Sequence, residues 1–382
     1  MTTPTLTGTE LGVAGPQRPL LVLGPSLGTS AAALWARCAG QLRGEYQVIA
    51  WDLPGHGRSA PAGGPLDMAD LARGVLDLVD TVRPGAVFGY AGVSVGGAVG
   101  LQLLLDAPQR VSAAALLCTG ARIGSAAGWR ERAELVRGGG TAAVVDGSLQ
   151  RWFTPGFRDR EPGVVAALID ALRAADAESY ARVCAALETF DVRPRLAAIA
   201  APVLAVAGGE DLVTPAAGLA EIADGVRQGR LVVLDAVAHV APAERPAAVA
   251  VLLDELFDPR RAAGGAVRRA VLGDAHVDRA AAGTTPFTRD FQDLVTGHAW
   301  HDIWGRPGLD RRSRSLVTLT ALVALGHHEE LAMHVRAARA NGLSDDEIAE
   351  VLLQTAIYCG VPAANSAFRI AQRVLRELDG ES

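Results

Sequence analysis

The sequence lacks lysine altogether: its 36 basic residues are all arginine, and 42 acidic residues give a net charge of −6. An acidic chain of this kind argues against nucleic acid or an anionic membrane surface as a partner. Only four cysteines occur, without the paired spacing of a disulfide framework or a zinc site. No apolar run reaches the roughly 20 residues that span a bilayer, and the N-terminus has no secretory-signal pattern. We therefore expect a cytoplasmic protein that binds neither nucleic acid nor membrane.

The pattern of the chain changes near residue 257. Before it, short apolar segments typical of buried strands alternate with helical periods, and after it only helical periods remain. We expect an α/β domain over residues 1–256, a linker over residues 257–267, where charged residues, Pro and Gly gather, and a smaller all-α domain over residues 268–382. Residues 121–196 are mostly helical and interrupt the strands, which predicts a helical lid on the first domain.

The most informative motif is G-x-S-x-G at residues 92–96, with Ser94 at its centre. An apolar run leads into it and a helical stretch follows, which is the strand, tight turn and helix that a nucleophile elbow needs. The flanking glycines suit a strained turn that neighbouring backbone passes closely. The helix that begins after Ser94 favours negative charge at this point. The motif therefore predicts a nucleophilic serine.

A serine nucleophile needs a histidine base and a carboxylate that orients the base. Asp211 follows an apolar strand-like segment, and Glu210 beside it is the competing carboxylate. His239 follows the next such segment and completes the chain order Ser, acid, His. His56 is the one other histidine in the first 250 residues and lies in a Gly/Pro turn, where a structural role is favoured. We predict the triad Ser94, Asp211 and His239.

With these residues, the first domain resembles the α/β-hydrolases over about residues 15–256. The segment Ser26-Leu27-Gly28-Thr29 is similar to that of the 3-oxoadipate enol-lactonases more than to that of generic esterases. The resemblance implies an oxyanion hole made by the backbone amides of Leu27 and Val95. It also implies a substrate carboxylate that needs an arginine, for which Arg122 and Arg130 are candidates. Trp129, in the predicted lid, is a candidate wall of the pocket over Ser94.

In the all-α domain, His327, Glu330 and His334 recur at i, i+3 and i+7 on one helical face. Their order is not that of a H-E-x-x-H zinc site, and no third cluster of ligands accompanies them. The domain resembles the carboxymuconolactone decarboxylase family over about residues 271–378. The matching motifs are Arg312-Ser313-Arg314-Ser315-Leu316-Val317-Thr318-Leu319, Glu330-Leu331-Ala332-Met333-His334-Val335-Arg336-Ala337-Ala338, Gly342-Leu343-Ser344 and Gly360-Val361-Pro362-Ala363-Ala364-Asn365.

The resemblance to the decarboxylase branch implies loss of CO2 from an unsaturated carboxylactone without a cofactor or a metal. The protein must then stabilise an oxyanion and deliver a proton to carbon. His334 is the expected proton donor, Glu330 its orienting partner and His327 a substrate-binding residue. Arg311, Arg312 and Arg314 are candidates for holding carboxylates, and a solvated face explains them equally well. The family also implies a homo-oligomer that assembles through this domain.

The two resemblances together imply a bifunctional enzyme of protocatechuate catabolism by the β-ketoadipate route. The all-α domain would decarboxylate 4-carboxymuconolactone, and Ser94 would open the resulting enol-lactone to 3-oxoadipate. Two alternatives remain open at this point. One is a carboxylesterase and the other a perhydrolase-like α/β-hydrolase, each with a helical module that serves assembly alone.

Overall fold

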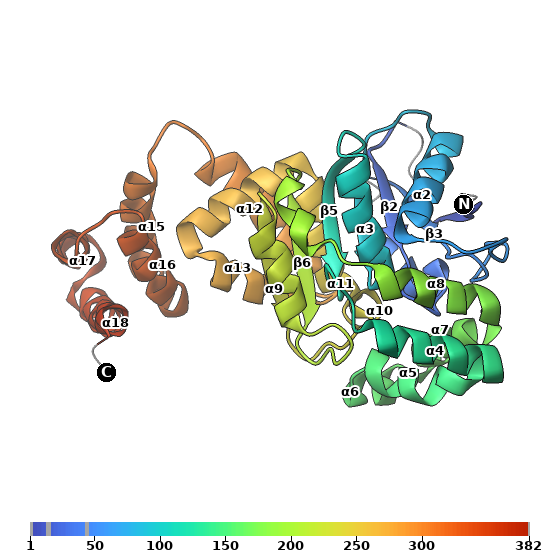
Figure 1. Ribbon diagram of the computed structural model, residues 1–382. Coiled ribbons are helices and arrows are strands. Elements are labelled where there is room, and N and C mark those ends of the chain that lie inside the picture. Colours follow the sequence, from blue (N-terminus) through green and yellow to red (C-terminus); the bar gives the residue numbers. More distant parts are fainter. Residues whose placement is uncertain (1–2, 13–16, 43–45, 381–382) are drawn as a thin grey trace. The chain divides into compact units, whose positions relative to one another are not determined.

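The computed structural model describes residues 3–12, 17–42 and 46–380 (Figure 1). The chain divides into two compact units. The first comprises residues 1–258 with the short stretch 284–286, and the second comprises residues 259–283 and 287–382. Within the described ranges, no helix is both long enough and apolar enough to cross a membrane.

A seven-stranded sheet is found within the described residues of the first unit, in the order β1-β3-β2-β4-β5-β6-β7. Strand β1 runs antiparallel to β3, and the other neighbouring pairs are parallel. The strands are β1 (Gly8–Glu10), β2 (Leu20–Gly24), β3 (Gln47–Trp51), β4 (Phe88–Val93), β5 (Val111–Leu117), β6 (Val203–Gly208) and β7 (Gly229–Leu234). Every residue of β2, β3, β4 and β6 is buried, as expected for strands that helices cover on both faces.

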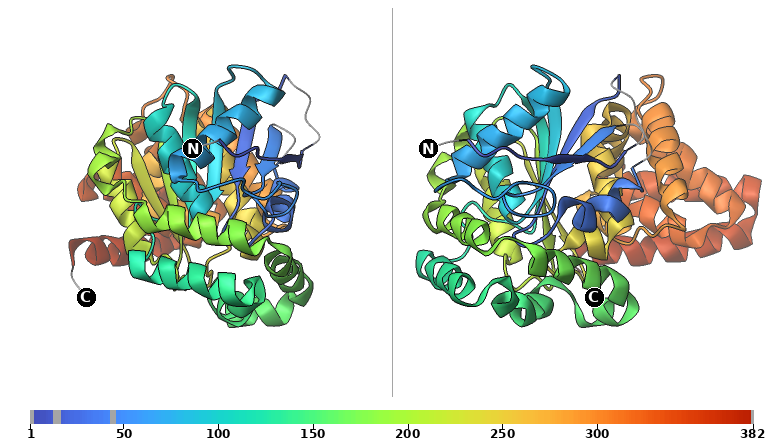
Figure 2. Two further views of the ribbon diagram at one scale, coloured as in Figure 1. Left: turned by 45° about the vertical axis from the view of Figure 1, so that its right-hand side comes forward. Right: turned by 90° about the vertical axis from the view of Figure 1, so that its right-hand side faces the viewer.

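Two groups of helices cover this sheet (Figure 2). Helix α2 packs on α3, whereas α1 packs on α10 and α11. The covering helices are α1 (Ala31–Ala39), α2 (Met68–Val82), α3 (Val95–Asp106), α9 (Ala216–Gly225), α10 (Ala241–Glu244) and α11 (Pro246–Phe257). The predicted α/β-hydrolase architecture is therefore confirmed.

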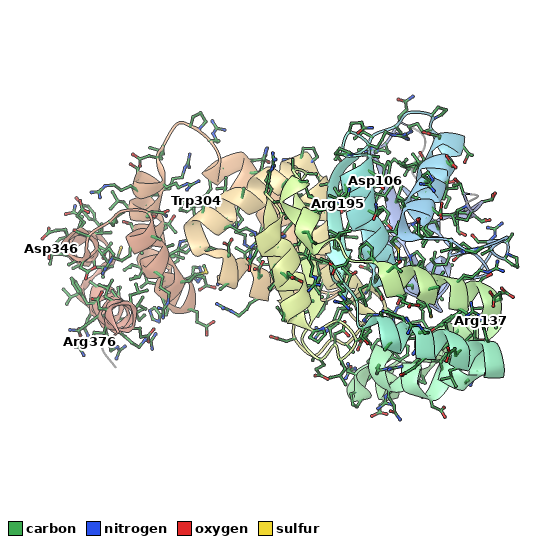
Figure 3. The ribbon with its side chains drawn as sticks, viewed as in Figure 1. Asp106, Arg137, Arg195, Trp304, Asp346 and Arg376 are labelled. Atoms are coloured by element: carbon green, nitrogen blue, oxygen red, sulfur yellow. The ribbon has the colours of Figure 1, made fainter. Side chains whose placement is uncertain are left out.

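The insert between β5 and β6 is helical, as the sequence predicts for the lid. It consists of α4 (Ala126–Gly139), η1 (Thr141–Val144), α5 (Val145–Trp152), α6 (Pro155–Arg160), α7 (Pro162–Ala174), α8 (Ala177–Thr189) and η2 (Arg193–Ala198). Helices α4 and α8 pack together, and Arg137 of α4 pairs with Glu178 of α8 at 2.9 Å (Figure 3). The lid is thus a small helical assembly inserted at the carboxyl ends of the strands.

The described part of the second unit contains helices and no strand. They are α12 (Pro259–Leu272), α13 (Asp274–Ala282), α14 (Arg289–Leu294), the π-helix η3 (Val295–Trp304), α15 (Arg311–Leu325), α16 (His328–Ala340), α17 (Asp345–Cys359) and α18 (Val361–Asp379). Leu319, Leu331 and Leu352 lie in the core that α15 to α18 share. A second, smaller core joins Val271, Trp300 and Ala337. The predicted all-α domain is confirmed.

The segment 257–267, which the composition favours as a linker, is instead mostly helix. Pro259 begins α12, where its missing N–H is tolerated, and the helix continues to Leu272. Gly264 serves close packing rather than chain flexibility. A Cβ there would lie 2.3 Å from the carbonyl oxygen of Thr296 in η3. The residues that suggested a linker therefore form part of the second unit's helical packing.

Candidate active site

Ser94 lies at the tight turn between β4 and α3, with φ +56° and ψ −117°. A positive φ is costly for any residue with a Cβ, so the surrounding backbone must hold it. The flanking glycines make that possible. A Cβ on Gly92 would lie 2.3 Å from the carbonyl oxygen of Gly96, and one on Gly96 would lie 2.5 Å from that of Pro25. The elbow therefore presents Ser94 from a strained turn, as the motif predicts.

His239 and Asp211 are joined by a buried hydrogen bond. The Nδ1–H of His239 donates to Oδ2 of Asp211 at 2.9 Å, and the hydroxyl of Thr214 donates to the same oxygen at 2.6 Å. Burial alone would raise the pKa of Asp211, but the His239 charge and these hydrogen bonds hold it below its ordinary value. The structure places Asp211 rather than the exposed Glu210 against His239.

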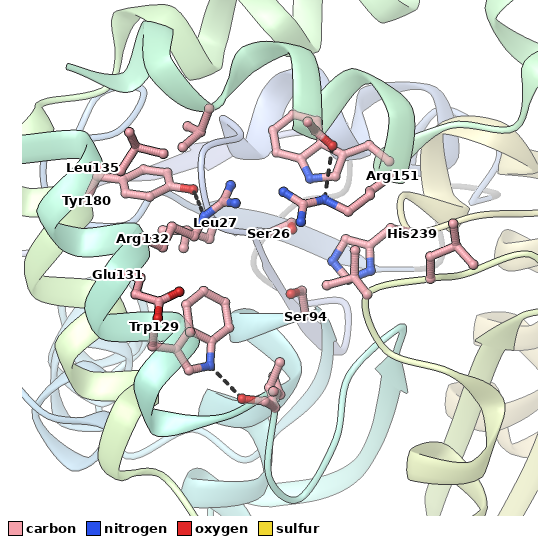
Figure 4. Close-up of a pocket in the computed structure, with 18 of the residues that line it drawn as sticks. Ser26, Leu27, Ser94, Trp129, Glu131, Arg132, Leu135, Arg151, Tyr180 and His239 are labelled. Atoms are coloured by element: carbon pink, nitrogen blue, oxygen red, sulfur yellow. Dashed lines mark hydrogen bonds between the residues drawn. The ribbon is translucent and has the colours of Figure 1, made fainter. Parts of the chain in front are cut away.

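Ser94 and His239 both line a cavity of about 520 Å³ beneath the lid, here called the Ser94 cavity (Figure 4). With Nδ1 bound to Asp211, the other ring nitrogen of His239 is left as the proton acceptor. Such an arrangement suits general-base activation of a serine hydroxyl.

Two backbone amides could stabilise an oxyanion here. Val95 begins helix α3, so its N–H has no partner within the helix. Leu27 lines the Ser94 cavity on a turn that Ser26 and Thr29 close through a 2.8 Å hydrogen bond. Among the described residues, neither amide donates to another group. This is the pair that the resemblance to the α/β-hydrolases implies.

One face of lid helix α4 forms a wall of the Ser94 cavity. Gly128, Glu131, Arg132 and Leu135 line it at the spacing i, i+3, i+4 and i+7. Trp129, predicted as a wall, lines it too and donates from Nε1 to the carbonyl of Ile123 at 2.5 Å.

The predicted arginines, in contrast, are not on this wall. Arg122 is exposed and lies outside the Ser94 cavity, and Arg130 pairs with Glu188 on the lid. The sequence prediction of a substrate arginine at these two positions is therefore not supported by the geometry. Arg132 and Arg151 line the cavity instead.

Arg132 and Arg151 point toward one another above Ser94 (Figure 4). Arg132 donates to the Tyr180 hydroxyl at 2.8 Å, and Arg151 donates to the carbonyl of Gly147 at 3.0 Å. Burial and the charge of Arg132 lower the pKa of Arg151. Neither arginine pairs with a carboxylate among the described residues. The cavity lining thus has two arginines and one carboxylate, Glu131, so an anionic ligand would reduce the repulsion between the two guanidinium charges.

In the second unit, His334 of α16 lies against the aromatic rings of η3. Its ring stacks on Trp304, with centroids 6.2 Å apart, and Trp304 in turn contacts Trp300 at 5.2 Å. His334 Nδ1 and Trp300 Nε1 are buried and have no hydrogen-bond partner within the described residues. Burial, followed by the neighbouring His276, lowers the pKa of His334 to about 4. Sequence reasoning missed both tryptophans and His276.

The other residues predicted around His334 lie at the surface. Glu330 is exposed, and its charge acts on the His334 ring. His327 is exposed at the start of α16, roughly 10 Å along the helix axis from His334. Arg312 donates a hydrogen bond to the carboxylate of Glu347, and Arg314 donates to the carbonyls of Leu309 and Arg306. Arg311 is also exposed.

No group of three or more His, Cys, Asp or Glu side chains that could hold a metal ion is found in the described part of the chain. His298 and His301 both bond Asp302, at 3.2 and 2.8 Å. These three residues therefore form a hydrogen-bonded cluster in η3.

Two families match the chain over separate ranges: the Alpha/beta hydrolase family over residues 21–252 and the Carboxymuconolactone decarboxylase family over residues 289–373. The first range is 37% identical to 3-oxoadipate enol-lactonase 2 from Acinetobacter baylyi over 232 residues, 60% of this chain and 85% of that protein. The crystal structure of the enol-lactonase from Burkholderia xenovorans superposes with a TM-score of 0.63 and 34% identity, covering 66% of this chain and 96% of that one.

The second range is similar to a different protein of Acinetobacter baylyi. It is 45% identical to the 4-carboxymuconolactone decarboxylase over 112 residues, which are 29% of this chain and 84% of that protein. Each of the two matched ranges therefore covers most of the length of a separate relative. The chain belongs to the Alpha/beta hydrolase family, with an enol-lactonase-like hydrolase unit, and carries a second domain of the Carboxymuconolactone decarboxylase family.

Proposed function

We propose that this chain catalyses two consecutive steps of the β-ketoadipate route. The helical unit decarboxylates 4-carboxymuconolactone to 3-oxoadipate enol-lactone, and the hydrolase unit opens that lactone to 3-oxoadipate. The proposal is supported by similarity to one relative for each step and by the groups that line the Ser94 cavity.

In the hydrolytic step, His239 takes the proton of the Ser94 hydroxyl as the oxygen attacks the lactone carbonyl. The amides of Leu27 and Val95 hold the oxyanion that forms. The ring oxygen then leaves and receives the proton from His239, which leaves an acyl group on Ser94. A water molecule, activated by the same histidine, hydrolyses the acyl group and restores the serine. The enol freed by ring opening moves its proton from oxygen to carbon, which gives the ketone of 3-oxoadipate.

The observation that carries the substrate assignment is the pair Arg132 and Arg151. The enol-lactone keeps a free carboxylate beside the ring that is opened, whereas a simple ester does not. Arg132 and Arg151 form no ion pair with a carboxylate among the described residues, and the one acidic side chain beside them in the cavity lining is Glu131. The lining therefore carries more positive than negative charge. A bound carboxylate balances this charge through charge-assisted hydrogen bonds. The cavity is therefore better suited to a carboxylated lactone than to a neutral ester.

In the decarboxylation step, the electrons of the broken carbon–carboxylate bond move into the conjugated lactone. The resulting dienolate needs a proton on carbon, and we assign its delivery to His334. The pKa of about 4 leaves this ring neutral in the free protein at pH 7. Two substrate carboxylates beside the ring would raise the pKa of His334, as the charge of Glu330 already does. The ring would then be protonated before CO2 leaves.

The aromatic rings of η3 suit the same step. Trp304 stacks on His334 and would exclude water from one side of the reacting carbon. The buried nitrogens His334 Nδ1 and Trp300 Nε1 can meet oxygen atoms of a ligand, which would satisfy polar groups that are costly to leave alone. A π-helix is uncommon and is often found at functional sites.

We also propose that the helical unit self-associates. Ile357 and Tyr358 at the end of α17 are each 79% exposed, and Val361, which begins α18, is 71% exposed. Large apolar side chains gathered in this way are typical of a protein interface. Light scattering on the full chain tests this, and Ile357→Glu should lower the measured mass, whereas Leu378→Glu at the far end of α18 should not.

The experiment that tests the substrate assignment compares two lactones of equal ring structure, one with and one without the side-chain carboxylate. The proposal predicts that the carboxylated lactone is preferred by about 100-fold or more in kcat/KM, and that Arg132→Gln removes most of this preference. Equal rates for the two lactones would favour the carboxylesterase interpretation. Peracid formation from acetate and peroxide at a higher rate than lactone opening would favour the perhydrolase-like one.

A further inference from the structure

Glu244 is a buried carboxylate that takes no part in the triad. It ends the short helix α10 and is 8% exposed. Three donors converge on it. The amide of Ala238 donates to Oε1 at 2.8 Å, and the amide and hydroxyl of Thr154 donate to Oε2 at 3.1 and 2.8 Å. Burial raises the pKa of this carboxyl, while the hydrogen bonds from Ala238 and Thr154 oppose that rise.

The two partners of Glu244 belong to two different segments of the hydrolase unit, the histidine loop and the lid. Ala238 directly precedes His239, whereas Thr154 lies in the lid between α5 and α6. A second link runs beside the first, because the amides of His239 and Val240 both donate to the carbonyl of Trp152, at 3.2 and 3.3 Å. The histidine loop and the lid are thus joined by side-chain and backbone hydrogen bonds at one point.

The lid residues at this junction, 152–154, directly follow Arg151, which lines the Ser94 cavity. Arg151 precedes Trp152 in α5, and both side chains line the cavity together with His239. A shift of residues 152–154 relative to residues 238–240 would change the separation between the general base and the Arg151 guanidinium. Productive geometry in a bound substrate is sensitive to shifts of about 1 Å.

We propose that Glu244 is a positioning residue that fixes the Arg151 side of the lid at a set distance from His239. It thereby aligns the scissile carbonyl of a substrate whose carboxylate is held by the arginines. This inference rests on the hydrolytic half of the proposed function. It adds a residue that acts through others and touches no substrate atom.

The test uses the full chain and a matched pair of esters, 4-nitrophenyl hydrogen succinate, which carries a carboxylate, and 4-nitrophenyl butanoate, which does not. Glu244→Gln keeps the shape of the side chain but replaces one acceptor oxygen by an NH2 group. At least one of the amides of Ala238 and Thr154 then loses its acceptor. We expect kcat for the succinate ester to fall by about 10-fold with its KM nearly unchanged, because the arginines still hold the carboxylate. The kcat for the butanoate ester should fall by less than about 3-fold, because no carboxylate ties this substrate to the arginines and it can shift within the cavity.

Thr154 supplies a second and milder variant that tests the inference if Glu244→Gln does not fold. Thr154→Val removes the 2.8 Å hydroxyl contact and should show the same selective fall in kcat, whereas Thr154→Ser keeps the hydroxyl and should behave like the unmodified protein. Each rate is divided by the concentration of reactive Ser94, which is measured by titration with a phosphonate inhibitor. A variant that is partly unfolded is then not mistaken for one with a lower kcat.

Equal losses on the two esters, or no loss on either, would overturn the inference while leaving the hydrolase assignment intact. If the unmodified protein hydrolyses neither the esters nor the enol-lactone, the proposed function fails and the inference fails with it.

Discussion

The Nε–H of Arg132 donates a 2.8 Å hydrogen bond to the hydroxyl of Tyr180, and the Arg132 guanidinium lies 5.7 Å from the centre of that ring. Tyr180 is buried in α8, so it offers a fixed acceptor to a charged side chain that borders the Ser94 cavity. The lid therefore orients Arg132, the group that we propose binds the substrate carboxylate, through an internal contact rather than leaving it to solvent.

Removing that contact should weaken binding of the carboxylated lactone. Tyr180→Phe keeps the ring but deletes the acceptor, so Arg132 loses one of its two hydrogen-bond partners, Tyr180 and Ser148, and gains rotational freedom. We expect KM for the enol-lactone to rise by about 5- to 10-fold with little change in kcat. Steady-state kinetics measure this, and Tyr46→Phe is the matched control. A neutral lactone affected to the same extent would contradict the assigned role.

Ser94→Ala should separate the two activities. Without the nucleophile, opening of the enol-lactone should fall by about 10³-fold or more, because the oxyanion hole alone retains little catalysis. Release of CO2 from 4-carboxymuconolactone should stay within about 2-fold, since the two active sites use different residues. Accumulation of the enol-lactone, followed by its absorbance, is the expected signature. Parallel loss of CO2 release would show that the sites are not independent.

The opposite separation is expected for His334→Gln. The amide keeps a polar side chain of similar length but cannot deliver a proton, so CO2 release should fall by about 10²-fold or more. Enol-lactone supplied directly should still be opened at the normal rate. His328→Gln, on the same helix but exposed, is the control and should leave both rates unchanged. Retained decarboxylation in His334→Gln would remove this histidine from the mechanism.

His56 should make the hydrolase unit sensitive to acid. Burial lowers the pKa of its ring from 6.5 to about 4, while Nδ1 donates to the carbonyl of Pro54 at 2.9 Å. The unfolded chain takes up a proton below about pH 6.5 and the folded unit does not, so stability is lost as the pH falls from about 6.5 to 4. The loss is at most about 1.4 kcal/mol per pH unit, or about 3–6 °C in the midpoint of thermal inactivation.

His56→Asn tests this linkage, because its amide can still donate to Pro54 but does not titrate in this range. The midpoint of thermal inactivation of ester hydrolysis, measured after incubation between pH 4.5 and 7.5, should depend less on pH in the variant. Its absolute value can fall through lost stacking on Tyr180 without affecting the comparison. An unchanged slope would assign the acid sensitivity to other groups.

The placement of Ser94, Asp211 and His239 could be predicted because its signals are local. The serine, the acid and the histidine each follow a strand-like segment, and their order along the chain is that of the family. Each residue then lies at the carboxyl end of a parallel strand, where these ends meet at one edge of the sheet. The sequence favoured Asp211 with Glu210 as the competing carboxylate, and in the structure Asp211 contacts His239 whereas Glu210 is exposed.

The lid arginines could not be chosen in the same way, although helical periodicity held a clue. Residues one apart on a helix differ by about 100° in direction. Once Glu131 and Leu135 face the Ser94 cavity, Arg132 shares their face and Arg130 lies on the opposite side, where it pairs with Glu188. Arg151 comes from another lid helix, and nothing in its sequence neighbourhood signals that it faces Arg132.

The segment 257–267 misled the prediction for a different reason. Charged residues with Pro and Gly are typical of linkers, but a proline is tolerated at the start of a helix and glycine permits close contact between helices. Gly264 permits such a close contact, with the carbonyl oxygen of Thr296. Packing of this kind depends on a partner segment that lies far along the chain. For the same reason, the stacking of Trp304 on His334 was not predicted.

The most direct test of the account is to give the purified full chain 4-carboxymuconolactone and to follow CO2 and 3-oxoadipate together. The account predicts that both products appear from the one polypeptide, in equal final amounts, with the enol-lactone as the transient species. Hydrolysis of simple phenyl esters without either product would contradict it, and would leave the helical unit without a catalytic role on this substrate.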